Sequence, residues 1–118
     1  MNKLQSLLAG GLTALALVGA TAAAAGEVVT QAQIEAATTA AQHEAIARAY
    51  DEEATATELR ADSHAKMAQT YRLASSGKTP DASSMANHCS RLEKDYRDAA
   101  DEYRSMAAEH RKMAAEAK

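Results

Sequence analysis

The side chains in this sequence that can hold a metal ion are imidazole, thioether and thiol groups, gathered around one short break. His64-x-x-Met67 precedes the break, and Met85-x-x-His88-Cys89 follows it. Spacings of three or four place two side chains on one helical face, within reach of a single ion. These soft or borderline donors favour copper(I), and favour zinc where thiolate and imidazole dominate. The pattern predicts a metal site close to the break.

A second group of the same donors lies far from the break. His43 stands near the start of the first helical stretch, and Met106-x-x-x-His110-x-x-Met113 lies near the end of the second. Calcium and magnesium would need carboxylate oxygens, which these positions almost entirely lack. The four residues predict a second, weaker soft-metal site, since helix ends fray.

Each of these residues also has a purely structural interpretation. Methionine often fills space in a helical core, and interior histidines are often hydrogen-bonded rather than metallated. Tyrosine in a core packs its ring and sends its hydroxyl to a partner. Cys89, the single cysteine, is a ligand, a free thiol or one half of an intermolecular disulfide.

Two long helices are predicted to position these groups. Thr30-x-x-Gln33 and Thr39-x-x-Gln42 have the form of capping boxes at helix starts. A helical pattern then runs to residue 75, a turn with Gly77 and Pro80 occupies 76–81, and a second helix runs to about residue 115. Because the turn is short, the fold class is all-α, an antiparallel two-helix hairpin.

Rows of residues spaced by seven predict how the two helices pack. One row per helix carries the aromatic, imidazole and thiol groups: His43, Tyr50, Thr57, His64 and Tyr71 in the first, and Cys89, Tyr96, Tyr103 and His110 in the second. Beside them run Ala40, Ala47, Ala54, Ala61 and Ala68 in the first helix, and Met85, Leu92, Ala99, Met106 and Met113 in the second. A strict seven-residue repeat predicts left-handed supercoiled packing, with these rows inside.

The turn also predicts which residues face each other. In an antiparallel hairpin the numbers of facing residues have a constant sum, here about 153–158. A sum of 153 pairs His43 with His110, Tyr50 with Tyr103, Thr57 with Tyr96, and His64 with Cys89. The polar positions Asp51, Glu58, Arg72, Arg48, Asp62 and Gln69 are expected on the solvated far side. Glu53 and Arg60 fall at the inner edge, where they snorkel outward or pair with the other helix.

The first 25 residues have the pattern of a secretory signal peptide. Lys3 opens a positive region, an apolar run covers 7–18, and Ala23-x-Ala25 fits the cleavage rule, with Ala20-x-Ala22 as an alternative. The run is too short to span a bilayer, although an uncleaved anchor is the competing interpretation. We therefore expect an exported, periplasmic or extracellular protein without stable membrane insertion. Residues 26–38 would form a flexible segment or short helix, and 39–118 the hairpin domain.

Composition narrows the classes of protein further. The chain has 118 residues, a formal net charge of −3, no Phe or Trp, and four tyrosines. Nucleic-acid binding needs a basic surface, which this balance does not offer. The sequence has no phosphate-cradling glycine loop, no nucleophile–histidine–acid context and no inward carboxylate pair, so we predict no enzyme activity. Large apolar side chains are few, which predicts a homodimer forming a four-helix bundle.

The sequence thus predicts an exported helical protein that binds copper(I) for sequestration, transfer or sensing, with a metal-donor or metal-acceptor protein as partner. One alternative is a structural or stress-related interaction module whose alanine-rich face docks another chain. A b-type haem bundle is another, although the interior is alanine-rich and C-x-x-C-H is absent. These donors favour copper over zinc or haem.

Overall fold

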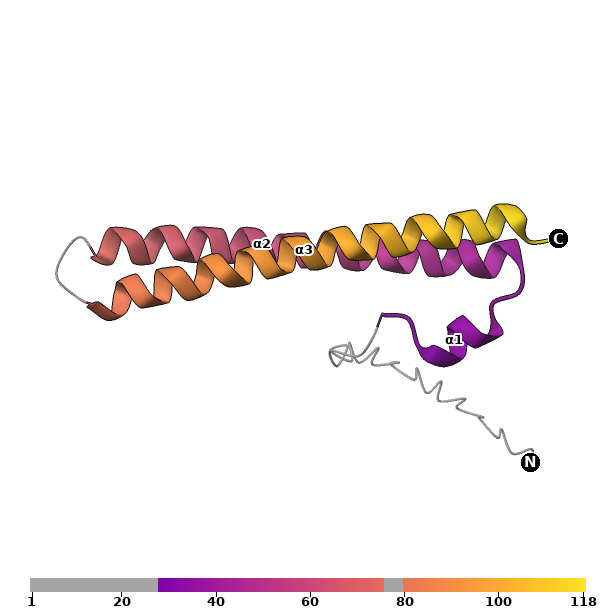
Figure 1. Ribbon diagram of the computed structural model, residues 1–118, viewed down its shortest axis with the longest axis horizontal. Coiled ribbons are helices and arrows are strands. Elements are labelled where there is room, and N and C mark those ends of the chain that lie inside the picture. The colour runs from indigo at the N-terminus through magenta and orange to yellow at the C-terminus, as the bar shows by residue number, and fades with distance from the viewer. Residues whose placement is uncertain (1–27, 76–79) are drawn as a thin grey trace, which may run out of the picture.

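The protein is all-helical in the residues that its computed structural model describes, 28–75 and 80–118. A short helix, α1 (Gln31–Ala36), precedes two long ones, α2 (Ala40–Ser75) and α3 (Pro80–Glu116). The long helices lie side by side and antiparallel, and α1 lies near the end where α2 begins and α3 ends (Figure 1). We call this the open end. The predicted signal peptide (1–25) and most of the predicted turn (76–81) lie outside the described residues.

Both capping boxes occur at helix starts. At α1, the Thr30 hydroxyl accepts from the Gln33 backbone N–H, and the Gln33 side chain accepts from the Thr30 backbone N–H. At α2, Thr39 and Gln42 exchange the same two bonds. These bonds satisfy backbone N–H groups that the start of a helix leaves without partners. Each helix therefore begins directly after its capping threonine. The 36 residues of α2 extend about 54 Å at 1.5 Å per residue.

The seam between α2 and α3 consists largely of alanine. In α2, Ala47, Ala54, Ala61 and Ala68 are buried, and in α3 the buried row is Ala86, Ala100, Ala107 and Ala114. Our prediction that the methionine row lies inside the seam was wrong. Met85, Leu92, Met106 and Met113 are each about two-fifths exposed. Alanine leaves room for two backbones to approach closely, whereas a row of methionines would hold them apart.

One edge of the seam carries ion pairs between the two helices. Arg97 pairs with Asp62, Arg104 with Glu58, and Arg111 with Asp51. Nearer the turn, Arg72 donates to the Ser90 hydroxyl at 2.6 Å. We call this edge the charged flank. Our prediction of a purely solvated far side was wrong for these acids and for Arg72, because they lie beside the seam and reach the other helix.

The opposite edge is mainly apolar, and we call it the apolar flank. It consists of Ile46 and Met67 from α2 with Met85, Leu92, Met106 and Met113 from α3. Glu53 and Arg60 interrupt it midway and form an ion pair of 2.8 Å within α2. The flank therefore has two apolar halves, one near the open end and one near the turn.

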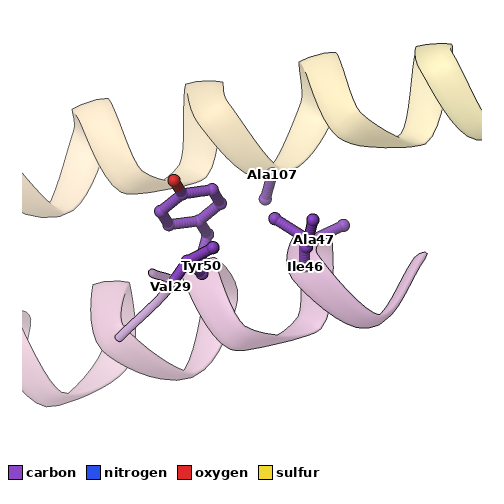
Figure 2. Close-up of a cluster of buried hydrophobic side chains, with 5 residues drawn as sticks. All are labelled: Val29, Ile46, Ala47, Tyr50 and Ala107. Atoms are coloured by element: carbon purple, nitrogen blue, oxygen red, sulfur yellow. The ribbon is translucent and has the colours of Figure 1, made fainter. Parts of the chain in front are cut away.

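Residues 28–36, here called the N-terminal strap, fold back against the open-end half. Val29 is buried against Ile46, Ala47, Tyr50 and Ala107 (Figure 2). The Tyr50 ring points from α2 toward α3, and Val29 lies alongside it. In the described chain, large apolar side chains are buried together in this cluster, whereas the other buried apolar residues of the seam are alanines and Cys89.

Candidate functional site

The open end of the seam brings two histidines from different helices into direct contact. The Nδ1 atoms of His43 and His110 lie 3.1 Å apart, and their ring centroids lie 5.3 Å apart. This confirms the predicted pairing. His110 is 9% exposed, and the Tyr50 ring lies 5.8 Å from it. The second predicted layer is also confirmed, because Tyr50 stacks on Tyr103 at 6.1 Å.

The surroundings of His110 disfavour its charged form. Burial lowers the pKa of His110, and the nearby His43 lowers it further. The carboxylates near this end are occupied, since Arg111 pairs with Asp51 at 2.6 Å and approaches Glu44 at 4.0 Å. With neutral rings, one Nδ1–H donates to the other Nδ1, or both nitrogens turn their lone pairs to one cation. Neutral imidazole is the form that binds metal ions.

The turn-proximal donors are only partly gathered. His64 stacks on Tyr96 at 5.4 Å, and its Nδ1 is buried without a hydrogen-bond partner among the described residues. Cys89 is a free thiol, 4% exposed. Tyr50 lies between Tyr103 and His110 of the other helix. The same register predicts that His64 lies between Tyr96 and Cys89.

The remaining predicted ligands lie outside the seam. His88 is exposed on α3, and Met67, Met85, Met106 and Met113 lie on the apolar flank at 38–43% exposure. Within residues 28–75 and 80–118, no three His, Cys, Asp or Glu side chains are grouped closely enough to hold an ion. The seam therefore brings one pair of donors into contact, His43 with His110, and thioethers lie on the adjoining flank.

Met106 lines a cavity. This cavity, of about 100 Å³, lies between the N-terminal strap and the hairpin and is bounded by Val28, Val29, Tyr50, Tyr103 and Met106. The strap thus lies beside Met106, which stays 40% exposed. Sequence reasoning did not find this contact, because no spacing links residues 28 and 29 to either helix.

The ion pairs of the charged flank were also missed, although a signal was present. Glu44, Asp51 and Glu58 are spaced by seven, as are Arg97, Arg104 and Arg111. Two opposite-sign rows of equal spacing on antiparallel helices indicate pairing across a seam.

The fold belongs to the broad class of all-helical hairpins, which hosts many unrelated functions. Comparison with protein-family models, curated proteins and solved structures gives no significant match to this chain. None of the helices formed by the described residues is both long enough and apolar enough to cross a membrane. The geometry of the seam is consequently what points to a function.

Proposed function

We propose that this protein binds copper(I) at the His43–His110 pair, with Met106 and Met113 as adjoining donors. The observation that carries the proposal is the 3.1 Å separation of the two Nδ1 atoms. Two imidazole nitrogens at 2.0–2.1 Å from one tetrahedral ion stand about 3.3 Å apart. A shift of a few tenths of an ångström would let both nitrogens bind the same ion.

The donor types favour copper(I) over zinc. A structural zinc ion takes four ligands from His, Cys, Asp and Glu, and the described residues bring only two such groups together here. Met106 and Met113 lie four residues before and three residues after His110 on the same face of α3. Thioethers are soft donors that suit monovalent copper.

The His64–Cys89 pair is the second candidate centre, with Met67 and Met85 on the adjoining flank. Its support is the buried Nδ1 of His64 without a hydrogen-bond partner among the described residues, since a buried polar atom usually has one. Cys89 adds a thiol that the seam shields. The burial of Cys89 also argues against an intermolecular disulfide, which was one of the three predicted states of this cysteine. His88 is not included, because it is exposed.

A small helical protein with such pairs suits sequestration of copper(I) or its transfer to and from another protein. Bound ions would lie at the edge of the seam, where an incoming ligand can reach them. The haem alternative is less well supported, because the alanine seam keeps the helices close. The cavity beside the tyrosine stack measures only about 100 Å³, against roughly 300–1,000 Å³ for sites that enclose drug-sized ligands.

Competition with a chromogenic copper(I) chelator tests the proposal. Metal-free protein should draw copper(I) from the chelator under reducing conditions. The double variant His43→Ala/His110→Ala should lose one equivalent, because both imidazole nitrogens are removed. His64→Ala/Cys89→Ser should lose the other. Chelator absorbance that stays unchanged at stoichiometric protein would refute copper binding.

The exposed histidine supplies the matched control. His88→Ala removes an imidazole from the same helix as His110 but from outside the seam, so uptake should stay at the wild-type level. Far-ultraviolet circular dichroism of every variant separates lost ligands from lost helix. Equal loss of uptake in the control and in the seam variants would count against the assigned ligands.

A further inference from the structure

The N-terminal strap is attached to the hairpin by one buried side chain. Val29 is 6% exposed, whereas every other residue of the strap is exposed, including Val28 and Ile34 at 39% and 44%. The short helix α1 has no buried residue of its own. The strap can therefore detach at little cost, since few apolar contacts oppose the conformational entropy that detachment regains.

Met106 belongs both to the surroundings of the strap and to the proposed copper site. It lines the cavity of about 100 Å³ together with Val28 and Val29. It also lies one helical turn before His110 on α3. A methionine in a helix leans toward the N-terminus of that helix, which for Met106 is the side of Tyr103, another residue of the cavity wall. In the metal-free protein, the thioether is thus on the strap side rather than the histidine side.

We propose that copper(I) bound by His43 and His110 draws Met106 away from the cavity and thereby releases the strap. This inference rests on the proposed function. To bind an ion held by His110, the thioether has to turn toward the C-terminal end of α3. The cavity then loses part of its wall, and Val28 and Val29 lose apolar contact on that side.

Met113 has no such conflict between the strap and the ion. It lies three residues after His110, so the same lean directs its thioether toward that histidine. It does not line the cavity beside the strap. Met113 therefore adds affinity for the ion, whereas Met106 couples binding of the ion to release of the strap.

The coupling acts in both directions. Copper(I) and the strap compete for one thioether, so a chain whose strap is already released binds copper(I) more tightly. Conversely, the bound ion changes how exposed residues 28–36 are at the protein surface. Such a change suits the sensing and transfer roles, because it makes occupancy of the site detectable by another molecule.

Methyl NMR of the purified protein, with its N-terminus read by intact mass, follows the strap directly. Copper(I) is diamagnetic and leaves the spectrum sharp. Val29 lies alongside the Tyr50 ring, which shifts its methyl resonances (Figure 2). Saturating copper(I) under reductant should move these resonances at least half of the way to those of an exposed valine. The methyl groups of Leu59, which is 65% exposed on α2, should not move.

Met106→Leu and Met113→Leu are the matched pair of variants. Each removes a thioether and keeps an apolar side chain of similar volume. We expect Met113→Leu to bind copper(I) more weakly and to keep the shift of Val29 at saturation. Met106→Leu should abolish that shift, although the histidine pair still binds the ion. A shift that persists in Met106→Leu would assign it to movement of the Tyr50 ring and would overturn the inference.

Competition with a copper(I) chelator measures the reverse effect. Val29→Ala should raise the copper(I) affinity at least about threefold, because a loosened strap no longer competes for the thioether. Ile34→Ala is the control, since Ile34 belongs to the strap but is 44% exposed, and it should leave the affinity unchanged. In a Met106→Leu background, adding Val29→Ala should have no effect.

The results separate this inference from the proposed function. Wild-type protein that takes up no copper(I) would overturn both. Uptake that leaves the Val29 resonances in place, or an affinity that Val29→Ala does not raise, would overturn the coupling and keep copper binding. An equal rise in affinity in Ile34→Ala would likewise overturn the role given to the Val29 contact.

Discussion

On the charged flank, arginine side chains cross from α3 to acids of α2, whereas on the apolar flank methionine and leucine side chains meet no such partners. Both flanks have the same seven-residue spacing and border the same alanine seam. The charged flank satisfies its own groups within one chain. The apolar flank instead has the strap against its open-end half, and its four methionines are about two-fifths exposed. A single repeat can thus produce one closed edge and one edge available for binding.

The largest expected effect comes from separating the helices, since both flanks depend on their close approach. Ala107→Leu should lower the free energy of unfolding by about 1–3 kcal/mol, because Ala107 is fully buried in the seam and a larger side chain overpacks it. The neighbouring Ala108 is exposed, so Ala108→Leu should change stability by less than about 0.5 kcal/mol. Urea denaturation measures both. Similar losses in the two variants would mean that the seam is not closely packed.

A smaller effect should follow from loosening the strap on the apolar flank. Val29→Ala removes two buried carbons at about 0.8 kcal/mol each, so hydrogen exchange at the α1 amides should speed up roughly tenfold. Val28→Ala should have less than half that effect, because Val28 is 39% exposed. Exchange in the middle of α3 should stay constant. Unchanged α1 exchange in Val29→Ala would show that the strap does not depend on this contact.

Acid should destabilise the seam beside the apolar flank. The pKa of His110 is lowered in the folded protein, so the unfolded chain takes up the proton first as pH falls. Stability from the neutral His110 ring is therefore complete above the ordinary histidine pKa of about 6.5 and decreases below it. The melting temperature of metal-free protein should fall between pH 7.5 and 5.5. In His110→Gln this fall should shrink, and an equal fall would assign the pH dependence to other groups.

Salt should act on the charged flank, with the smallest effect. Arg104→Gln removes the partner of Glu58, and both side chains are nearly half exposed, so the loss should be about 0.2–1 kcal/mol at low ionic strength. Screening in 1 M salt should reduce this difference toward zero. Lys112→Gln, a cation on α3 that the structure leaves exposed, is the control. A loss that persists in high salt would show that Arg104 acts through packing instead.

Several features of this protein followed from local sequence alone. The caps at Thr30 and Thr39 depend on side chains three residues apart, and both are present. The period of seven, together with a turn between the helices, was enough to pair His43 with His110 and Tyr50 with Tyr103. These features were predictable because the helix repeat and the position of the turn determine which layers meet.

The spacing of seven did not decide which row accompanies Cys89, Tyr96, Tyr103 and His110 in the seam. The row beginning at Met85 and the row beginning at Ala86 both adjoin that row on α3, so spacing does not distinguish them. Rotation of α3 about its axis does, because only one rotation joins the alanine rows of both helices and brings Arg97, Arg104 and Arg111 to the acids of α2. The methionines consequently lie on the outer edge. The contact of Val29 with Tyr50 likewise required the folded chain, because nothing near residue 29 in sequence specifies where it lands.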